Sequence, residues 1–172
     1  PGAVASPTAG LHFDPSLLNQ IEGKGVEILF VTLHVSYGTF QPVTNEDLTQ
    51  HKMIEEYFEI PEETAERINF AKVAGRRITA CGTTVVRALE SAATNSIPSE
   101  VEAKEGMTNL FVFPPYEFKI ADRMITNFHL PRTTLLMLAS AFAGCDLLMR
   151  AYREAIQNRY RFYSYGDAMF IV

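Results

Sequence analysis

A strand that turns directly into a helix is the feature of this sequence that most constrains its fold. The apolar residues Ile78–Cys81 predict a short strand, Gly82–Thr84 a tight turn, and the residues from about Val85 to Thr94 a helix. Predicted strands and helices alternate along the rest of the chain, and no internal repeat is visible. We therefore expect an α/β fold in which residues 1–172 form a single domain, a layered sheet with helices on both of its faces.

Apolar patterns and turn residues also predict the other strands and helices. Val26–Val35 is almost continuously apolar and rich in β-branched residues, which predicts a central strand covered on both faces. Further strands are expected at 109–113, 117–120, 124–127 and 167–172. Helices are expected at 14–22, 61–74, 131–144 and 147–160, the third of them apolar nearly all round and therefore buried. The polar stretch 44–59 has no clear periodicity, and 94–106 is expected to be a polar connection.

The cysteines and the apolar stretches limit the class of protein. Cys81 and Cys145 have no C-x-x-C spacing, which argues against a disulfide framework or a thiolate zinc site, so we expect two buried, reduced thiols. No apolar stretch approaches the roughly 20 residues that cross a bilayer, and Pro1–Gly10 does not resemble a signal peptide. We expect a cytoplasmic protein without a membrane partner, whose chain begins in the middle of a longer pattern.

The charge balance limits the partners. With 15 basic and 20 acidic residues the formal net charge is −5, which excludes a chain-wide attraction for nucleic acid but not a local basic patch. The local concentrations of positive charge are Lys72, Arg76 and Arg77, and Arg150, Arg153, Arg159 and Arg161. A phosphate backbone would have to bind at such a concentration, although a solvated helix face is the commoner explanation of the second group.

Familiar nucleotide-binding, zinc-protease and hydrolase signatures are absent, and five polar segments remain as candidates for chemistry. They are Ser6–Phe13, Leu33–Phe40, Gly82–Glu90, Thr126–Pro131 and Tyr160–Met169. The histidines of the first two are also explained as core or capping residues, and the third segment as a Thr-capped helix with a surface Arg87–Glu90 pair. Packing explains the aromatic residues of the last segment more simply than stacking on a base.

Four of these segments nevertheless indicate specific roles. The N–H groups and hydroxyls of Gly82–Thr84 at a helix start form a cradle for a carboxylate or phosphate. His34 ends a strand, where ligand sites collect in α/β folds. Asn127 and His129 lie between a strand and a buried helix, where unpaired polar groups cost about 1–3 kcal/mol. Asp167, at a strand start, is able to accept a proton or hold a sugar hydroxyl.

Taken together, in order and spacing, the segments resemble one family along essentially the whole chain. The matching strings are SPTAGLHF at 6–13, LHV and GTFQPV around 33–43, GTTVVRALES at 82–91, TNFHLPRTTLLMLASAFAG at 126–144 and YRFYSYGDAMFI at 160–171. The sequence is similar to the S-adenosylmethionine:tRNA ribosyltransferase-isomerases of queuosine biosynthesis. The resemblance implies transfer and rearrangement of the ribosyl part of S-adenosylmethionine onto 7-aminomethyl-7-deazaguanine at the tRNA wobble position. Epoxyqueuosine is formed, and adenine and methionine are released.

The implied reaction needs a base, an acid, a clamp for the methionine carboxylate and a slot for the modified base. On this resemblance, proton transfer is expected from some combination of His34, His129 and Asp167. An anionic group of the substrate is expected to bind to Thr83, Thr84 and Arg87. Further substrate-binding residues are expected to be Thr8, His12, Asn127 and Tyr165. S-adenosylmethionine is the expected co-substrate and the tRNA carrying 7-aminomethyl-7-deazaguanine the expected partner. No metal is expected, because the histidines are dispersed.

The sequence departs from the family pattern in three ways. The family is longer, and the amino-terminal half, which supplies part of the sheet and an inserted β-barrel domain, is expected to be a further partner. The family's His-x-Met-His-x-Glu pattern appears at His51–Glu56 with Ile54 in place of the second histidine. A Pro-Gly turn appears as Pro114-Pro115, and a glycine-containing loop as Ser36-Tyr37. Two alternatives stay open: a catalytically reduced module that binds S-adenosylmethionine or tRNA, and a divergent transferase.

Overall fold

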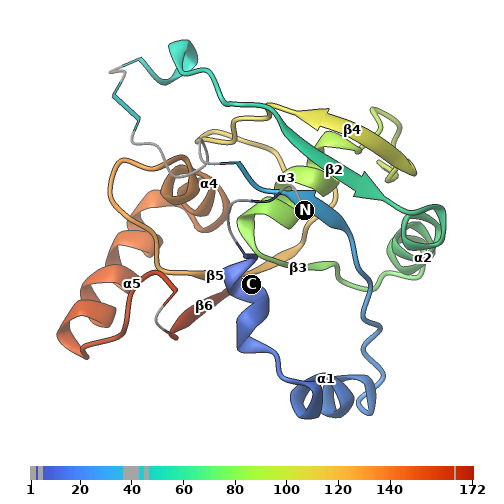
Figure 1. The fold of residues 1–172 in the computed structure, drawn as a ribbon, viewed down its shortest axis with the longest axis horizontal. Helices are drawn as coiled ribbons and strands as arrows, with labels where there is room; N and C mark the ends of the chain where they lie inside the picture. The colour runs from blue at the N-terminus through green and yellow to red at the C-terminus, as the bar shows by residue number, and fades with distance from the viewer. Residues whose placement is uncertain (1–2, 4–5, 37–42, 45–46, 165) are drawn as a thin grey trace.

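Helix α3 (Thr83–Ser91) lies between two three-stranded sheets in the computed structural model of the chain (Figure 1). The structure describes residues 3, 6–36, 43–44, 47–164 and 166–172. Among these residues, one sheet has the strand order β1-β2-β4 and is antiparallel throughout, and the other has the order β3-β5-β6. The expected α/β class is confirmed. In place of one layered sheet, however, the described strands form two small sheets with a helix between them.

The strands of the second sheet bring several chain segments to one edge. The first sheet consists of β1 (Thr32–His34), β2 (Glu56–Ile60) and β4 (Lys104–Thr108). The second consists of β3 (Thr79–Cys81), β5 (Arg123–Asn127) and β6 (Ala168–Ile171). β3 and β5 run parallel, and β5 and β6 run antiparallel with Asn127 opposite Ala168. The carboxyl ends of β3 and β5 and the start of β6 therefore lie at the same edge.

Helix α3 is buried because sheets cover it on two sides. Val86 and Ala88 are fully buried in the main hydrophobic core. Arg87 and Glu90 are buried as well, at 3% and 6% exposure, so the alternative of a surface pair between them is wrong. The Glu90 carboxylate accepts hydrogen bonds from the backbone N–H groups of residues 119–121 at 2.9–3.2 Å. These bonds compensate the buried charge and tie the segment before β5 to the helix.

The other expected helices are present, with boundaries shifted by a few residues. They are α1 (Pro15–Glu22), α2 (Glu62–Val73), α4 (Thr134–Ala143) and α5 (Cys145–Gln157), and the 3-10 helices η1 (Thr8–His12) and η3 (Leu48–Gln50) add to them. Asp14 caps α1 by accepting the Leu17 N–H at 2.7 Å. Gly144, with φ of +81°, lets the chain bend by 113° between α4 and α5.

A membrane-spanning helix is not found among the described residues. No single helix there is both long and apolar enough, and only the bent pair of α4 and α5 together reaches the required length and composition. Within that pair, α4 has no exposed residue, as its apolar sequence predicts.

The strand predictions in the first sheet are largely wrong. Only Thr32–His34 of the apolar run Val26–Val35 forms a strand, and this strand lies at a sheet edge instead of the centre. The Phe30 carbonyl just before it accepts a hydrogen bond from the Thr64 hydroxyl of α2, outside any sheet. β4 lies largely in the expected connection 94–106, whereas 109–113 and 117–120 form no strand. Val112 and Ile120 are nevertheless buried in the core, and Phe118 packs against it, from irregular backbone.

The two thiols also differ from expectation. Both cysteines are free, but Cys145 is exposed at the start of α5, so the prediction of two buried thiols is wrong. Cys81 is partly buried at the end of β3, and this burial raises the pKa of its thiol.

Candidate functional site

Segments far apart in the sequence meet at the edge where β3 and β5 end. Helix η1, at the start of the chain, packs against β5 (Figure 1). Gly82 follows β3 and donates its backbone N–H to the Ile125 carbonyl at 2.8 Å. A Cβ on Gly82 would lie 3.7 Å from the Ala9 Cβ, so η1 lies against the turn between β3 and α3. We define the sheet-edge site as the group Thr8, His12, Thr83, Thr84, Asn127 and Asp167.

Asn127 connects the first and last parts of this site. Its side chain is 3% exposed at the end of β5. The Nδ2 atom donates to the Tyr163 carbonyl at 2.8 Å and lies 3.0 Å from Nε2 of His12. The Tyr163 N–H in turn donates to the Phe128 carbonyl at 3.0 Å. A single buried amide therefore holds η1 and the segment before β6 against β5.

Asp167 lies just before β6 as an ionised carboxylate. It accepts the backbone N–H of Arg161 at 2.5 Å and the Arg161 Nε–H at 3.2 Å. These hydrogen bonds from Arg161 hold the pKa of Asp167 below its usual range, and electrostatic interactions with Arg161 and His12 act in the same direction. Gly166, with φ of +119°, adopts a backbone conformation that strains other residues, and a Cβ here would lie 3.0 Å from the Arg161 guanidinium. Asp167 is thus held as a carboxylate that is able to stabilise a positive charge or accept a hydrogen bond from a hydroxyl.

The start of α3 presents hydrogen-bond donors at the same edge. Thr83 and Thr84 are its first two residues, and its N-cap residue Gly82 forms no side-chain cap hydrogen bond. Thr83 is buried and Thr84 partly exposed. The backbone N–H groups in the first helical turn have no acceptor inside the helix, and the helix dipole adds a partial positive charge. This arrangement suits a carboxylate or another anion.

His129 lies close to this edge and is partly buried. Its Nε2 atom is 2.7 Å from the Thr126 hydroxyl, and its backbone N–H donates to the Tyr152 hydroxyl at 2.7 Å. Burial lowers the pKa of His129 to about 4, so its ring is neutral at physiological pH. Burial also raises the pKa of Tyr152 to about 12, which keeps that hydroxyl protonated.

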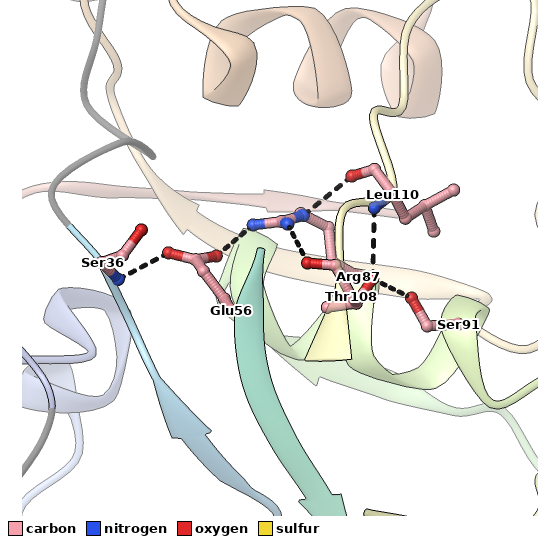
Figure 2. A network of polar contacts seen from close by, with 6 residues as sticks. All are labelled: Ser36, Glu56, Arg87, Ser91, Thr108 and Leu110. Atoms are coloured by element: carbon pink, nitrogen blue, oxygen red, sulfur yellow. Dashed lines mark hydrogen bonds and ion pairs between the residues drawn. The ribbon is translucent and has the colours of Figure 1, made fainter. Parts of the chain in front are cut away.

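Arg87 occupies a buried polar network one turn further along α3 (Figure 2). Its guanidinium donates to the Glu56 carboxylate, to the Leu110 carbonyl at 2.9 Å and to the Thr108 carbonyl at 3.5 Å. The second Glu56 oxygen accepts the Ser36 N–H at 2.7 Å. Binding of a substrate anion by Arg87 stays a prediction. The structure shows its guanidinium paired with protein groups.

Glu56 is a polar residue that the sequence reasoning did not single out. It is 1% exposed on β2, where a carboxylate requires a charged partner. The signal that pointed to it was the family's His-x-Met-His-x-Glu pattern, whose last position it occupies. Ile54, which stands in place of the second histidine, is 48% exposed.

His34 lies in the first sheet, on β1, and not with the residues of the second sheet. It is partly buried opposite Tyr57 of β2, with the ring centroids 5.0 Å apart. Tyr165 lies outside the described residues, as do residues 37–40 of the second polar segment. Within the described part of the chain, no group of three or more His, Cys, Asp and Glu side chains is placed to hold a metal ion.

The chain matches a known protein family over nearly its whole length. Residues 1–171 match the sequence model of a family described as queuosine biosynthesis protein. The chain belongs to this family. The S-adenosylmethionine:tRNA ribosyltransferase-isomerase of Sulfurihydrogenibium sp. is 57% identical over 171 residues, which are 99% of this chain and 49% of that protein. The protein of the same name from Natranaerobius thermophilus is 55% identical over 170 residues, again 99% of this chain and 49% of that protein.

A solved structure shares the fold of this family member. The crystal structure of S-adenosylmethionine tRNA ribosyltransferase from Thermotoga maritima superposes with a TM-score of 0.75 at 44% identity, over 95% of this chain and 51% of that chain. The chain thus spans about half the length of the curated relatives it matches. The resemblance seen in the sequence strings is confirmed.

Proposed function

We propose that the sheet-edge site binds S-adenosylmethionine and takes part in transferring its ribosyl group to 7-aminomethyl-7-deazaguanine at the wobble position of tRNA. Rearrangement of the ribosyl group gives epoxyqueuosine, and adenine and methionine are released. Family membership and the names of the relatives support this reaction. The single observation that supports this position of the binding site is the contact between His12 and Asn127. It joins two segments that match the family strings, at a sheet edge where α3 also begins.

The start of α3 is proposed to bind the methionine carboxylate. Thr83 and Thr84 supply hydroxyls beside the N–H groups of the first helical turn, where the helix dipole favours a negative charge. Arg87 supports this end of the helix through its pair with Glu56. Thr8 and His12 on η1 are proposed to contact the remainder of the same substrate, and Tyr165 the modified base.

Proton transfer is proposed to involve Asp167, with His129 and His34 as the other groups. Asp167 is ionised at neutral pH, so it is suited to remove the proton beside the sulfonium or to stabilise positive charge on the ribosyl group. His129, whose pKa is about 4, is neutral and acts through hydrogen bonds, for which Thr126 fixes its ring. His34 lies on β1 of the first sheet and is proposed to act in the departure of adenine.

The tRNA is proposed to bind through a local basic surface, because the net charge of the chain is −5. Four exposed arginines lie on or after α5: Arg150, Arg153, Arg159 and Arg161. The part of the family's length that this chain does not span is proposed to supply the rest of the tRNA surface. Since the substrate is tRNA, we place the reaction in the cytoplasm.

Adenine release tests the proposed function. Purified protein is incubated with S-adenosylmethionine, with and without tRNA carrying 7-aminomethyl-7-deazaguanine, and free adenine is quantified by chromatography. We expect adenine only when the modified tRNA is present, in step with a mass increase of the tRNA. Adenine without tRNA would indicate a transferase for another substrate. Binding of S-adenosylmethionine without any adenine release would indicate a binding module.

A further inference from the structure

We propose that Asn127 is a positioning residue that holds the neutral His12 imidazole in the tautomer with its proton on Nδ1. The inference is based on the two contacts of the Asn127 amide, with the Tyr163 carbonyl and with the His12 ring. Its consequence for substrate binding rests on the proposed function, because it assigns His12 the role of a hydrogen-bond donor inside the sheet-edge site.

The orientation of the Asn127 amide is fixed by a backbone group. An asparagine side chain carries an oxygen that only accepts and a nitrogen that only donates. The Tyr163 carbonyl, which only accepts, lies 2.8 Å from Nδ2 of Asn127. Turning the amide over would place two oxygens against each other in a site where Asn127 is 3% exposed. The NH2 group of Asn127 must therefore face Tyr163.

The second N–H of the same group fixes the tautomer of His12. Nδ2 of Asn127 lies 3.0 Å from Nε2 of His12 and has a second hydrogen to donate. A neutral imidazole has one nitrogen that donates and one that accepts, and the accepting nitrogen must be Nε2 here. The proton of the neutral ring is consequently on Nδ1. A backbone carbonyl thus selects the donor atom of His12 through one intervening amide.

This tautomer determines which chemistry His12 offers to a ligand. Nε2 is occupied by the Asn127 N–H, so the neutral ring presents Nδ1–H and interacts with an acceptor atom, such as a hydroxyl or carboxylate oxygen or a ring nitrogen of the substrate. Both ring nitrogens donate when the imidazole is positively charged, so the tautomer is a property of the neutral ring alone. The tautomer is therefore measured under conditions where the imidazole is neutral.

Long-range proton–nitrogen NMR on protein labelled with nitrogen-15 in histidine reads the tautomer directly, because protonated and unprotonated ring nitrogens resonate far apart. The spectrum is recorded at about pH 8.5, above the ordinary imidazole pKa of about 6.5. His12→Gln identifies the His12 signals by their loss. In the wild type we expect a protonated Nδ1 and an unprotonated Nε2. In Asn127→Asp we expect the reverse, because a carboxylate only accepts and requires a proton on Nε2.

Asn95→Asp is the matched control. Asn95 is exposed, and its Oδ1 accepts from Lys119 Nζ at 2.7 Å, so the same substitution adds the same charge while keeping the hydrogen bond. We expect the wild-type tautomer of His12 in this variant. A proton on Nε2, or a rapidly exchanging mixture, in the wild type would overturn the inference. The wild-type spectrum alone decides this point if Asn127→Asp does not fold.

The outcome is separable from that of the proposed function. Calorimetric titration with S-adenosylmethionine is performed on the same samples. The expected tautomer without any binding of S-adenosylmethionine leaves the inference standing and contradicts the proposed function. If the wild-type protein binds S-adenosylmethionine but carries the His12 proton on Nε2, the proposed binding of S-adenosylmethionine is supported and the inference about Asn127 is overturned.

Discussion

The carboxylate of Glu56 on β2 is paired with the guanidinium of Arg87 on α3, and both side chains are almost completely buried (Figure 2). The second carboxylate oxygen accepts the N–H of Ser36, two residues after His34. α3 begins at the sheet-edge site, and β1 ends at His34. The pair therefore connects the first sheet to α3 and fixes the position of one proposed group relative to the other.

Removing one charge of this pair is expected to destabilise the protein strongly. Glu56→Gln leaves the buried Arg87 without its carboxylate, and such an unpaired buried charge costs about 3–5 kcal/mol. Urea unfolding followed by circular dichroism measures this loss. Glu27→Gln is the matched control, since Glu27 pairs with Arg67 at the surface and water screens that pair. Equal losses in the two variants would contradict the assignment.

Replacing both charges is expected to cost less than the sum of the single changes. Glu56→Met combined with Arg87→Met removes both the attraction and the two desolvation penalties. A double-mutant cycle of unfolding free energies gives the coupling, which we expect to reach about 1–3 kcal/mol. Strict additivity is the result that speaks against a coupled pair.

The turn at Gly82 is expected to tolerate no side chain without strain. Gly82 has φ of +105° and ψ of 145°, a backbone region that only glycine adopts readily, at a cost of about 1–3 kcal/mol for other residues. We expect Gly82→Ala to lower the free energy of unfolding by this amount and to weaken binding of S-adenosylmethionine. Gly10→Ala provides the comparison, because a Cβ there meets only the Pro7 side chain at 4.0 Å and we expect it to be nearly neutral. A larger effect at Gly10 than at Gly82 would refute this prediction.

Stability is expected to decrease in mild acid because of His129. Burial lowers the pKa of His129 to about 4, from an ordinary value of about 6.5. Between these two values the unfolded chain binds a proton that the folded protein does not. The free energy of unfolding therefore decreases as the pH is lowered from about 6.5 to about 4, by up to about 3 kcal/mol in total.

Urea unfolding of the wild type and His129→Gln at about pH 7 and about pH 4.5 measures this dependence. At the higher pH both proteins carry a neutral side chain here, so their difference reports packing and the hydrogen bond with Thr126, without a contribution from charge. We expect the variant to lose less stability than the wild type on acidification. Identical losses would show that His129 does not contribute.

The helices were predictable from the sequence because their signals are local. Asp14 before Pro15 marks the start of α1, and the apolar periodicity of α4 and the glycine at 144 mark a helix and its end. The strands of the first sheet were not predictable in this way, because pairing with residues distant in the sequence determines which segments become strands. The polar Lys104–Thr108 becomes β4 through its ladder with β2, whereas the apolar Val26–Val35 yields only the short edge strand β1.

The sequence strings predicted candidate residues for the site but not how they pair. His12 and Asn127 are 115 positions apart, and no local pattern predicts their hydrogen bond. Arg87 and Glu56 are 31 positions apart, so a buried ion pair and a surface arginine have the same appearance in the sequence. Only tertiary packing distinguishes a guanidinium that is paired inside the protein from one exposed at the surface.

The most direct test of the sheet-edge site compares adenine release by the wild type, Asp167→Asn and Asp146→Asn in the presence of tRNA carrying 7-aminomethyl-7-deazaguanine. Asp146 is exposed in the first turn of α5, so its variant makes the same chemical change away from the site. We predict that Asp167→Asn lowers the rate about 100-fold or more while its unfolding midpoint stays near that of the wild type, and that Asp146→Asn keeps the wild-type rate. Equal rates in the two folded variants would contradict a role of Asp167 in the reaction.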